Sequence, residues 1–178
     1  MNWPRLAVLV SLVALAVASR LLPHPDNVTA VGGLAVFAGA MFRDRRLALG
    51  LPLAALFLSD LVVGLHAHVP VVYASFAASV LIGRWLAASR TVAGVAGATL
   101  LGAAQFFAVT NFACWVQFYP PTFAGFAECY ASAVPYFRSS LAGDFACVAV
   151  LFGVVRAAEA AAPGLRERST FPQVAPVA

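Results

Sequence analysis

The sequence contains no lysine and little charge of either sign. Only 10% of its 178 residues are charged, whereas 62% are hydrophobic. An average soluble domain has about 25% charged and about 45–50% apolar residues. A water-soluble fold of this length cannot bury so much apolar surface, which excludes an ordinary soluble enzyme. Disorder is excluded because it requires low hydrophobicity and high charge. The mean hydropathy of +0.90 therefore indicates a polytopic membrane protein.

Sequence motifs for catalysis and cofactor binding are also missing. There is no phosphate-binding loop, dinucleotide fingerprint, serine-hydrolase elbow or zinc-protease motif. We therefore expect no enzymatic activity and no cofactor. The arginines form no dense stripe, so nucleic acid is not an expected partner. Three cysteines without a CxxC motif favour apolar packing over a disulfide framework or zinc site. His24, His66 and His68 are weak candidates for metal ligands.

The apolar runs predict an all-α bundle of about six transmembrane helices, because one span requires roughly 20 residues. Residues 1–162 form a single integral membrane domain in this interpretation, and the polar, proline-containing residues 163–178 form a flexible cytoplasmic tail. The stretch from Gln117 to Arg138, rich in proline and aromatics, is expected to separate the last two spans. The predicted spans are Leu6–Leu22, Thr29–Phe42, Leu47–Leu65, Val71–Ala87, Val92–Val116 and Leu141–Ala158.

Arginine positions predict the orientation of these spans, because arginine is enriched in short cytoplasmic loops. With both termini in the cytoplasm, Arg20 and Arg138 lie outside. The remaining arginines lie inside, namely Arg5, Arg43, Arg45, Arg46, Arg84, Arg90, Arg156, Arg166 and Arg168. This asymmetry favours an even number of spans in the cytoplasmic (bacterial inner) membrane.

Two carboxylates lie within apolar spans, where a charge costs about 2.5–3.5 kcal/mol on the insertion scale. Asp60 and Asp144 are therefore candidate functional groups. The structural alternative is that Asp60 pairs with Arg20, and Asp144 with Arg138, to hold helices together. Both interpretations can apply at once, because paired charges can line a pocket.

The predicted topology places polar residues from several segments at the outer face. Polar groups in an apolar bundle are expected to converge where water or a ligand satisfies them. Gln105 and Asn111 could instead join helices by hydrogen bonds, and the aromatics near the outer face could form an interfacial belt or a stacking wall for a flat ligand. The predicted substrate-binding residues are Asn27, Asp60, Asn111, Tyr119, Tyr130 and Arg138.

The short second span and the small residues of the first span suggest two further roles. The N-terminus of a short helix, capped by Asn27 or Thr29, could bind an anionic ligand group, although a tilted ordinary helix explains its length equally well. Ala7 with Ser11, and Ala14 with Ala18, have the four-residue spacing that lets helices approach closely.

Several segments together resemble a known family. They are Arg20–Asn27, Leu58–Gly64, Thr110–Phe112, Tyr119-Pro120 and Cys129–Arg138. The set is similar to a bacterial family of small integral membrane proteins described as transport proteins, which resembles the substrate-binding S components of energy-coupling factor (ECF) transporters. Asp26 departs from the proline or uncharged residue expected there.

This resemblance implies a six-helix bundle that binds a micronutrient, vitamin-like or metal, from outside. It also implies that Ala14 and Ala18 dock onto a transmembrane coupling subunit, with ATPases as further partners. We therefore expect a substrate-binding subunit of an uptake transporter. The alternative is a structural or assembly subunit of a membrane complex with a packed interior and no ligand, and a membrane enzyme is a third, weaker possibility.

Overall fold

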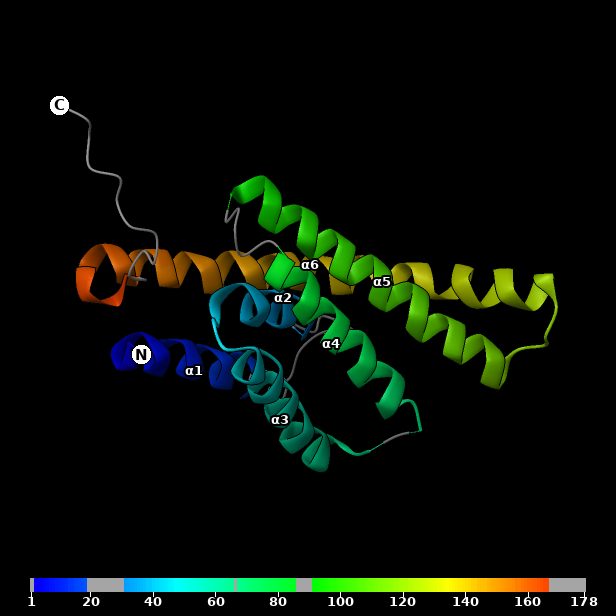
Figure 1. Cartoon of the computed structure of the whole chain (residues 1–178). Coiled ribbons are helices and arrows are strands. Elements are labelled where there is room, and N and C mark those ends of the chain that lie inside the picture. The colour runs from blue at the N-terminus through cyan, green and yellow to red at the C-terminus, as the bar shows by residue number, and fades with distance from the viewer. Residues whose placement is uncertain (1, 19–30, 66, 86–90, 167–178) are drawn as a thin grey trace.

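The described part of the chain is helical and contains no strand. The computed structural model describes residues 2–18, 31–65, 67–85 and 91–166. Six α-helices are followed by a short 3-10 helix (Figure 1). Their bounds are α1 Trp3–Ala18, α2 Val31–Met41, α3 Arg45–Val63, α4 Val69–Trp85, α5 Val92–Phe118, α6 Phe123–Ala161 and η3 Pro163–Leu165.

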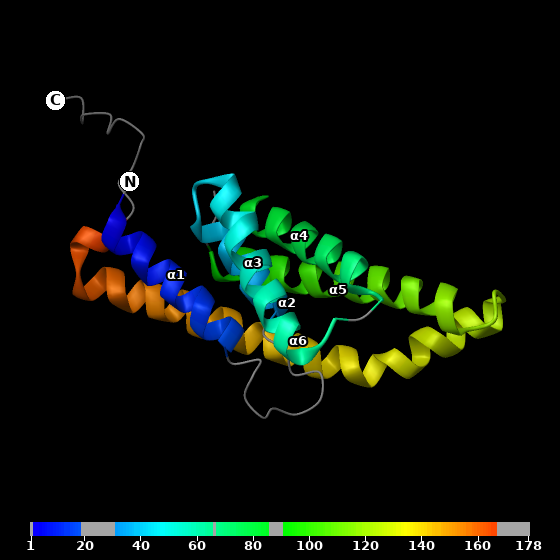
Figure 2. The same ribbon diagram turned by 90° about the horizontal axis from the view of Figure 1, so that it is seen from below.

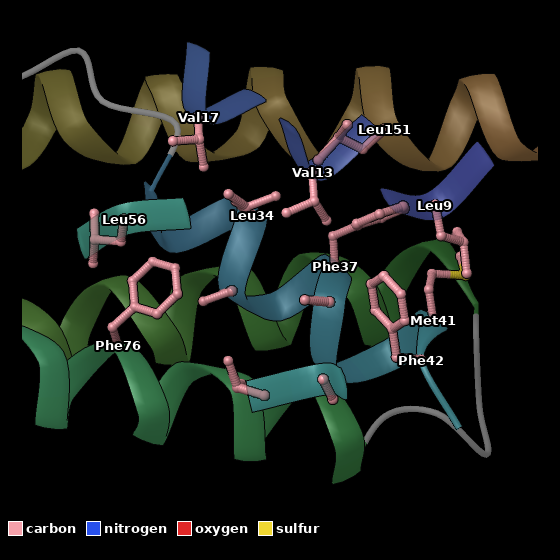
Figure 3. Packing of buried hydrophobic residues seen from close by; sticks show 14 of the residues in the cluster. Leu9, Val13, Val17, Leu34, Phe37, Met41, Phe42, Leu56, Phe76 and Leu151 are labelled. Atoms are coloured by element: carbon pink, nitrogen blue, oxygen red, sulfur yellow. The ribbon is translucent and has the colours of Figure 1, made fainter. Parts of the chain in front are cut away.

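Helix α2 lies at the centre of the fold because it is apolar on every side. All its residues from Gly33 to Met41 are buried, and it contacts each of the other five α-helices. A helix without a polar face has no side that favours water. Figure 3 shows side chains of α2 surrounded by those of α1, α3, α4 and α6. The Phe37 ring meets Phe152 of α6 edge-on, with ring centroids 5.3 Å apart.

Helices α2 and α4 approach each other through two glycines. A Cβ atom on Gly39 would lie 2.0 Å from the Val80 carbonyl oxygen, and one on Gly83 would lie 2.2 Å from the Val36 carbonyl oxygen. Real Cβ atoms do not approach backbone so closely, so this crossing requires glycine at both positions.

Local capping interactions explain where three helices begin. The Asp44 carboxylate accepts hydrogen bonds from the amides of Arg46 and Leu47 at the start of α3. Thr91 and Thr122 cap α5 and α6 in the same way, each accepting from the amide three residues on. Such caps satisfy amides that have no partner within the helix.

Helix α6 corrects the prediction for residues 117–138. The predicted loop contains only a short turn, because α6 runs without interruption from Phe123 to Ala161 over 39 residues. Thr122 supplies the cap, and the helix accommodates Pro135 in its interior. Figure 2 shows α6 bending within its yellow part, the kind of deformation that a proline permits. At 1.5 Å per residue the helix is about 58 Å long.

The first residues of the predicted tail also depart from expectation. Pro163–Leu165 form η3, and its backbone is tied to the start of α1. The Asn2 side chain donates to the Gly164 carbonyl at 2.7 Å, and Arg5 Nη1 donates to the Leu165 carbonyl at 3.0 Å. Residues 163–166 are thus joined by hydrogen bonds to the start of α1 and the end of α6, although most of them are exposed. The rest of the predicted tail lies outside the described residues.

In the described part of the chain, two helices, α5 and α6, are long and apolar enough, by length and composition alone, to cross a membrane. Large apolar side chains are also exposed on several helices, among them Leu15, Val62, Trp85, Val92, Phe118 and Phe123. The six-helix prediction is confirmed at the level of an all-helical bundle in the described residues.

Candidate ligand-binding site

A cavity of about 330 Å³ lies where α5 and α6 meet the start of α2. Its walls combine apolar and aromatic side chains with few polar groups, which is typical of small-molecule sites. Most of its lining comes from α5 and the first half of α6, the two helices that lie side by side in Figures 1 and 2. The lining residues are Gly32, Ala103, Phe106, Phe107, Asn111, Ala133, Tyr136, Phe137, Ser140 and Asp144.

Asp144 of α6 is the charged residue of this wall, and it is only 5% exposed. Its Oδ1 accepts a hydrogen bond from the amide of Gly33 at 2.8 Å. The carboxylate therefore satisfies a backbone amide at the start of α2, where the helix dipole favours a negative charge. The glycine pair permits this approach, because a Cβ atom on Gly32 would lie 2.5 Å from Asp144 Oδ2.

This arrangement bears on two expectations. An anionic ligand group was expected at the start of the second span, where Asn27 and Thr29, the expected caps, lie outside the described residues; at Gly33 the side chain of Asp144 supplies a negative group. Asp144 was also a possible partner of Arg138, yet Arg138 is exposed and no ion pair joins these two described residues. The carboxylate caps a helix because α6 packs against α2, a tertiary contact that sequence spacing does not reveal.

Asn111 is the predicted site residue that lines the cavity. Its Nδ2 donates to the Phe107 carbonyl one turn earlier in α5, at 2.8 Å. The neighbouring Thr110 makes an equivalent bond to the Phe106 carbonyl but does not line the cavity. Asn111 and Asp144 thus place an amide group and a carboxylate group in the wall of the same cavity.

The aromatic residues near this cavity pack on one another between α5 and α6. The Phe107 ring lies 5.6 Å from Tyr130 and 4.8 Å from Phe137, measured between centroids. Tyr130 also packs on Phe126 at 4.4 Å and donates its hydroxyl to the Ala108 carbonyl at 2.6 Å. Tyr130 therefore supports the wall from behind Phe107 and does not line the cavity itself.

Asp60 lies in a separate polar contact between α3 and α4. It is 5% exposed, and its Oδ2 accepts the Tyr73 hydroxyl at 2.7 Å. Asp60 does not line the cavity described above. Its predicted partner Arg20 lies outside the described residues, as does Asn27.

The remaining predicted residues are not brought together at this site. Tyr119 ends α5 as its C-cap, and Arg138 is exposed on α6. His68 packs edge-on against Phe118, with centroids 5.5 Å apart, while His24 and His66 lie outside the described residues. Among the described residues, no three His, Cys, Asp or Glu side chains form a group that could hold a metal ion. Of the predicted substrate-binding residues that the structure describes, Asn111 alone lines this cavity.

Two helix-contact predictions can be compared directly with the structure. Gln105 Nε2 donates to the Ser75 carbonyl and to Ser79 Oγ, both at 2.8 Å, so it joins α5 to α4 as the structural alternative predicts. Ala14 and Ala18 are exposed on α1, on a face largely opposite the buried Leu9 and Val13. They are therefore accessible to another protein.

The sequence prediction missed most of the cavity wall. Phe106, Phe107 and Ser140 were not predicted as site residues, because the packing of α5 against α6 brings them to the cavity. Tyr136 and Phe137 belong to the aromatics that were expected to form either an interfacial belt or a stacking wall, and both line the cavity. The adjacent Gly32 and Gly33 in a short apolar span were a usable signal, since paired glycines allow a side chain to reach the backbone.

The comparisons with known proteins identify a family without assigning an activity. A family model described as a family of unknown function (DUF6580) matches residues 1–165. The chain belongs to this family. Neither the curated proteins nor the solved structures gave a match.

Proposed function

We propose that this DUF6580 protein is a six-helix integral membrane protein that binds a small molecule from the outer face, as the substrate-binding subunit of an uptake transporter. The observation that carries the proposal is the cavity between α2, α5 and α6, where Asn111, Ser140 and Asp144 line a space whose other walls are apolar and aromatic. Asp144 is buried and Asn111 half-buried, and both line this cavity, where a ligand would add to the hydrogen bonds that they already make within the protein.

The arrangement of the arginines supports the proposed topology. Arg84 donates to the carbonyl oxygens of Phe42 and Arg43, and Arg5 pairs with Glu159. Segments predicted to be cytoplasmic thus meet at one end of the bundle, and α2 runs from the cavity at Gly32 towards that end at Met41. With the arginines inside, the cavity opens toward the outer half of the bilayer.

The exposed apolar surface supports membrane insertion. In the isolated chain Trp85, Val92 and Phe123 are largely exposed, and patches of this kind on a soluble monomer would favour aggregation. In a bilayer the same side chains face lipid at no cost.

The resemblance to ECF S components suggests the class of cargo and the partners. We propose a micronutrient, vitamin-like or metal, as cargo, with a transmembrane coupling subunit docking at Ala14 and Ala18 and ATPases driving import. The exposure of both alanines on α1 is compatible with such docking.

The proposal is tested by purifying the full-length chain from its native membranes and analysing the extract by mass spectrometry. A small molecule that remains bound through purification, and is absent from a mock purification, is the expected result. A protein that carries no ligand and does not gain thermal stability from any tested micronutrient would instead favour a structural or assembly subunit.

A further inference from the structure

The arginine-rich end of the bundle contains a second, larger cavity. Its volume is about 710 Å³, and it lies between the start of α1, the turn from α2 to α3, and η3. It is separated from the first cavity by most of the length of α2, because one cavity contacts Gly32 and the other contacts Met41. It is therefore an independent site.

Three guanidinium groups line this cavity. Arg5 is buried and paired with Glu159. Arg43 is exposed, and Arg166 is exposed while its Nε donates to the Glu159 carbonyl at 3.2 Å. The Asp44 carboxylate also lines it, but its Oδ1 accepts the backbone amides that cap α3. Glu159 offsets the charge of Arg5 and Asp44 adds a negative charge, so Arg43 and Arg166 leave the cavity with a net positive charge. The planar guanidinium group of arginine matches the geometry of a phosphate well.

The rest of the lining is apolar, which favours an amphiphile over a free anion. Leu6, Leu9 and Met41 form part of the wall beside the arginines. Trp3 is 67% exposed and lies at the same cavity, where an indole at a membrane interface is commonly found. A ligand with a phosphate head and acyl chains would match both kinds of surface.

Arginines whose role is only to orient the protein in the membrane do not need to line a cavity. Arg45 and Arg46 are examples, since both are exposed in the same turn and neither lines the cavity. Arg5 differs, because an ion pair with Glu159 and a bond to the Leu165 carbonyl hold its guanidinium in place. Binding sites commonly hold a charged group in a fixed position within a pocket that is partly polar and partly apolar.

We propose that this second cavity binds the phosphate headgroup of an anionic phospholipid, with Arg43 and Arg166 contacting the phosphate beside the fixed Arg5. The lipid would stabilise the packing of α1 and η3 against the α2–α3 turn. This proposal requires that the chain lies in a membrane, but it does not depend on the identity of any cargo. It can therefore be tested separately from ligand binding at the first cavity.

The test uses the full-length chain in non-ionic detergent and follows thermal unfolding with added lipid. A ligand that binds only the folded state raises the unfolding temperature. Phosphatidylglycerol, phosphatidylcholine with the same acyl chains, and glycerol phosphate are compared. The lining variant is Arg43→Gln with Arg166→Gln, and the matched control is Arg45→Gln with Arg46→Gln, which removes the same charge from exposed positions outside the cavity.

We expect phosphatidylglycerol to raise the unfolding temperature and phosphatidylcholine to have little effect. The lining variant should bind phosphatidylglycerol about 30-fold more weakly, since each arginine near a lipid surface contributes about 1 kcal/mol. The control variant should bind nearly as well as the wild type. Equal weakening in both variants would show general charge attraction and overturn the proposal. If glycerol phosphate raised the unfolding temperature as much as phosphatidylglycerol, the ligand would be a soluble anion. If no lipid had an effect, an acidic protein segment would be favoured as the occupant. Either result would overturn the lipid proposal.

Discussion

The amide of Gly33 donates a hydrogen bond to the carboxylate of Asp144 at 2.8 Å, which links the central helix α2 to α6 in the wall of the smaller cavity. The bond fixes the start of α2 with a negative group supplied by the protein itself. It also gives this buried carboxylate a defined structural role next to a space that a ligand can enter.

Substitution of Asp144 tests this capping role. Asp144→Ala removes the acceptor and leaves the Gly33 amide unsatisfied, which should lower the free energy of unfolding by about 1–3 kcal/mol. Asp144→Asn keeps an oxygen acceptor of the same shape and should lose clearly less. Unfolding of the purified protein in detergent measures both, and equal losses for the two variants would show that the hydrogen bond does not stabilise the fold.

The close crossing of α2 and α4 predicts a sharp difference between two glycines. Gly83→Ala would place a methyl group 2.2 Å from the Val36 carbonyl oxygen, so we expect a loss of about 1–3 kcal/mol. Gly97→Ala in α5 meets nothing within 4 Å and should be neutral or stabilise by about 0.5–1 kcal/mol. Thermal unfolding of the two variants under identical conditions decides the question, and similar stabilities would contradict the described crossing.

The ion pair between Arg5 and Glu159 is expected to hold α1 against the end of α6. Arg5 is buried, so Glu159→Ala leaves a charge in a poor environment and should cost about 2 kcal/mol, between the values for exposed and buried pairs. Glu128→Ala, at an exposed position of the same helix, serves as the control and should have little effect.

A double-mutant cycle with Arg5→Gln separates the pair from its surroundings. If the effects of Arg5→Gln and Glu159→Ala simply add, the two side chains do not stabilise each other.

The proposed topology is tested by single cysteines in a background without Cys114, Cys129 and Cys147. Ala67 and Ala162 are both exposed and flank different ends of the predicted spans. A cysteine at position 67 should react with an impermeant thiol reagent in intact cells, whereas one at position 162 should react only after permeabilisation. Labelling of position 162 from outside would refute the six-span arrangement.

Most helices could be predicted from the sequence because their apolar runs end at clear signals. The expected span Val92–Val116 corresponds to α5 at Val92–Phe118, and Leu47–Leu65 corresponds to α3 at Arg45–Val63. Asp44 and Thr91 mark the starts of these two helices by capping them. Such local signals depend only on neighbours in the sequence.

The first half of α6 could not be predicted in this way. Pro120, Pro121 and Pro135 suggested a loop, but Thr122 caps the helix and aromatic packing against α5 stabilises it. That packing joins residues such as Phe107 and Tyr130, which are far apart in the sequence, so local patterns do not reveal it.

The candidate site was predicted only in part for the same reason. Asn111 and Asp144 were both identified as polar residues in apolar spans, and both line the cavity. The prediction did not identify Gly33 as the partner of Asp144, because the packing of α2 on α6 determines it. Asp60 was assigned to the same cavity, but it contacts Tyr73 of α4 instead.

The cavity beside Asn111 is the proposed site of the small molecule. The most direct measurement is the amount of ligand that remains bound to purified protein, compared between Asn111→Leu and Thr110→Val. Both side chains donate to a carbonyl one turn earlier in α5, but only Asn111 lines the cavity. We predict about tenfold less bound ligand for Asn111→Leu, the effect of losing one buried polar contact, and no change for Thr110→Val. Equal retention in the two variants, or a ligand-free wild-type protein, would contradict the account.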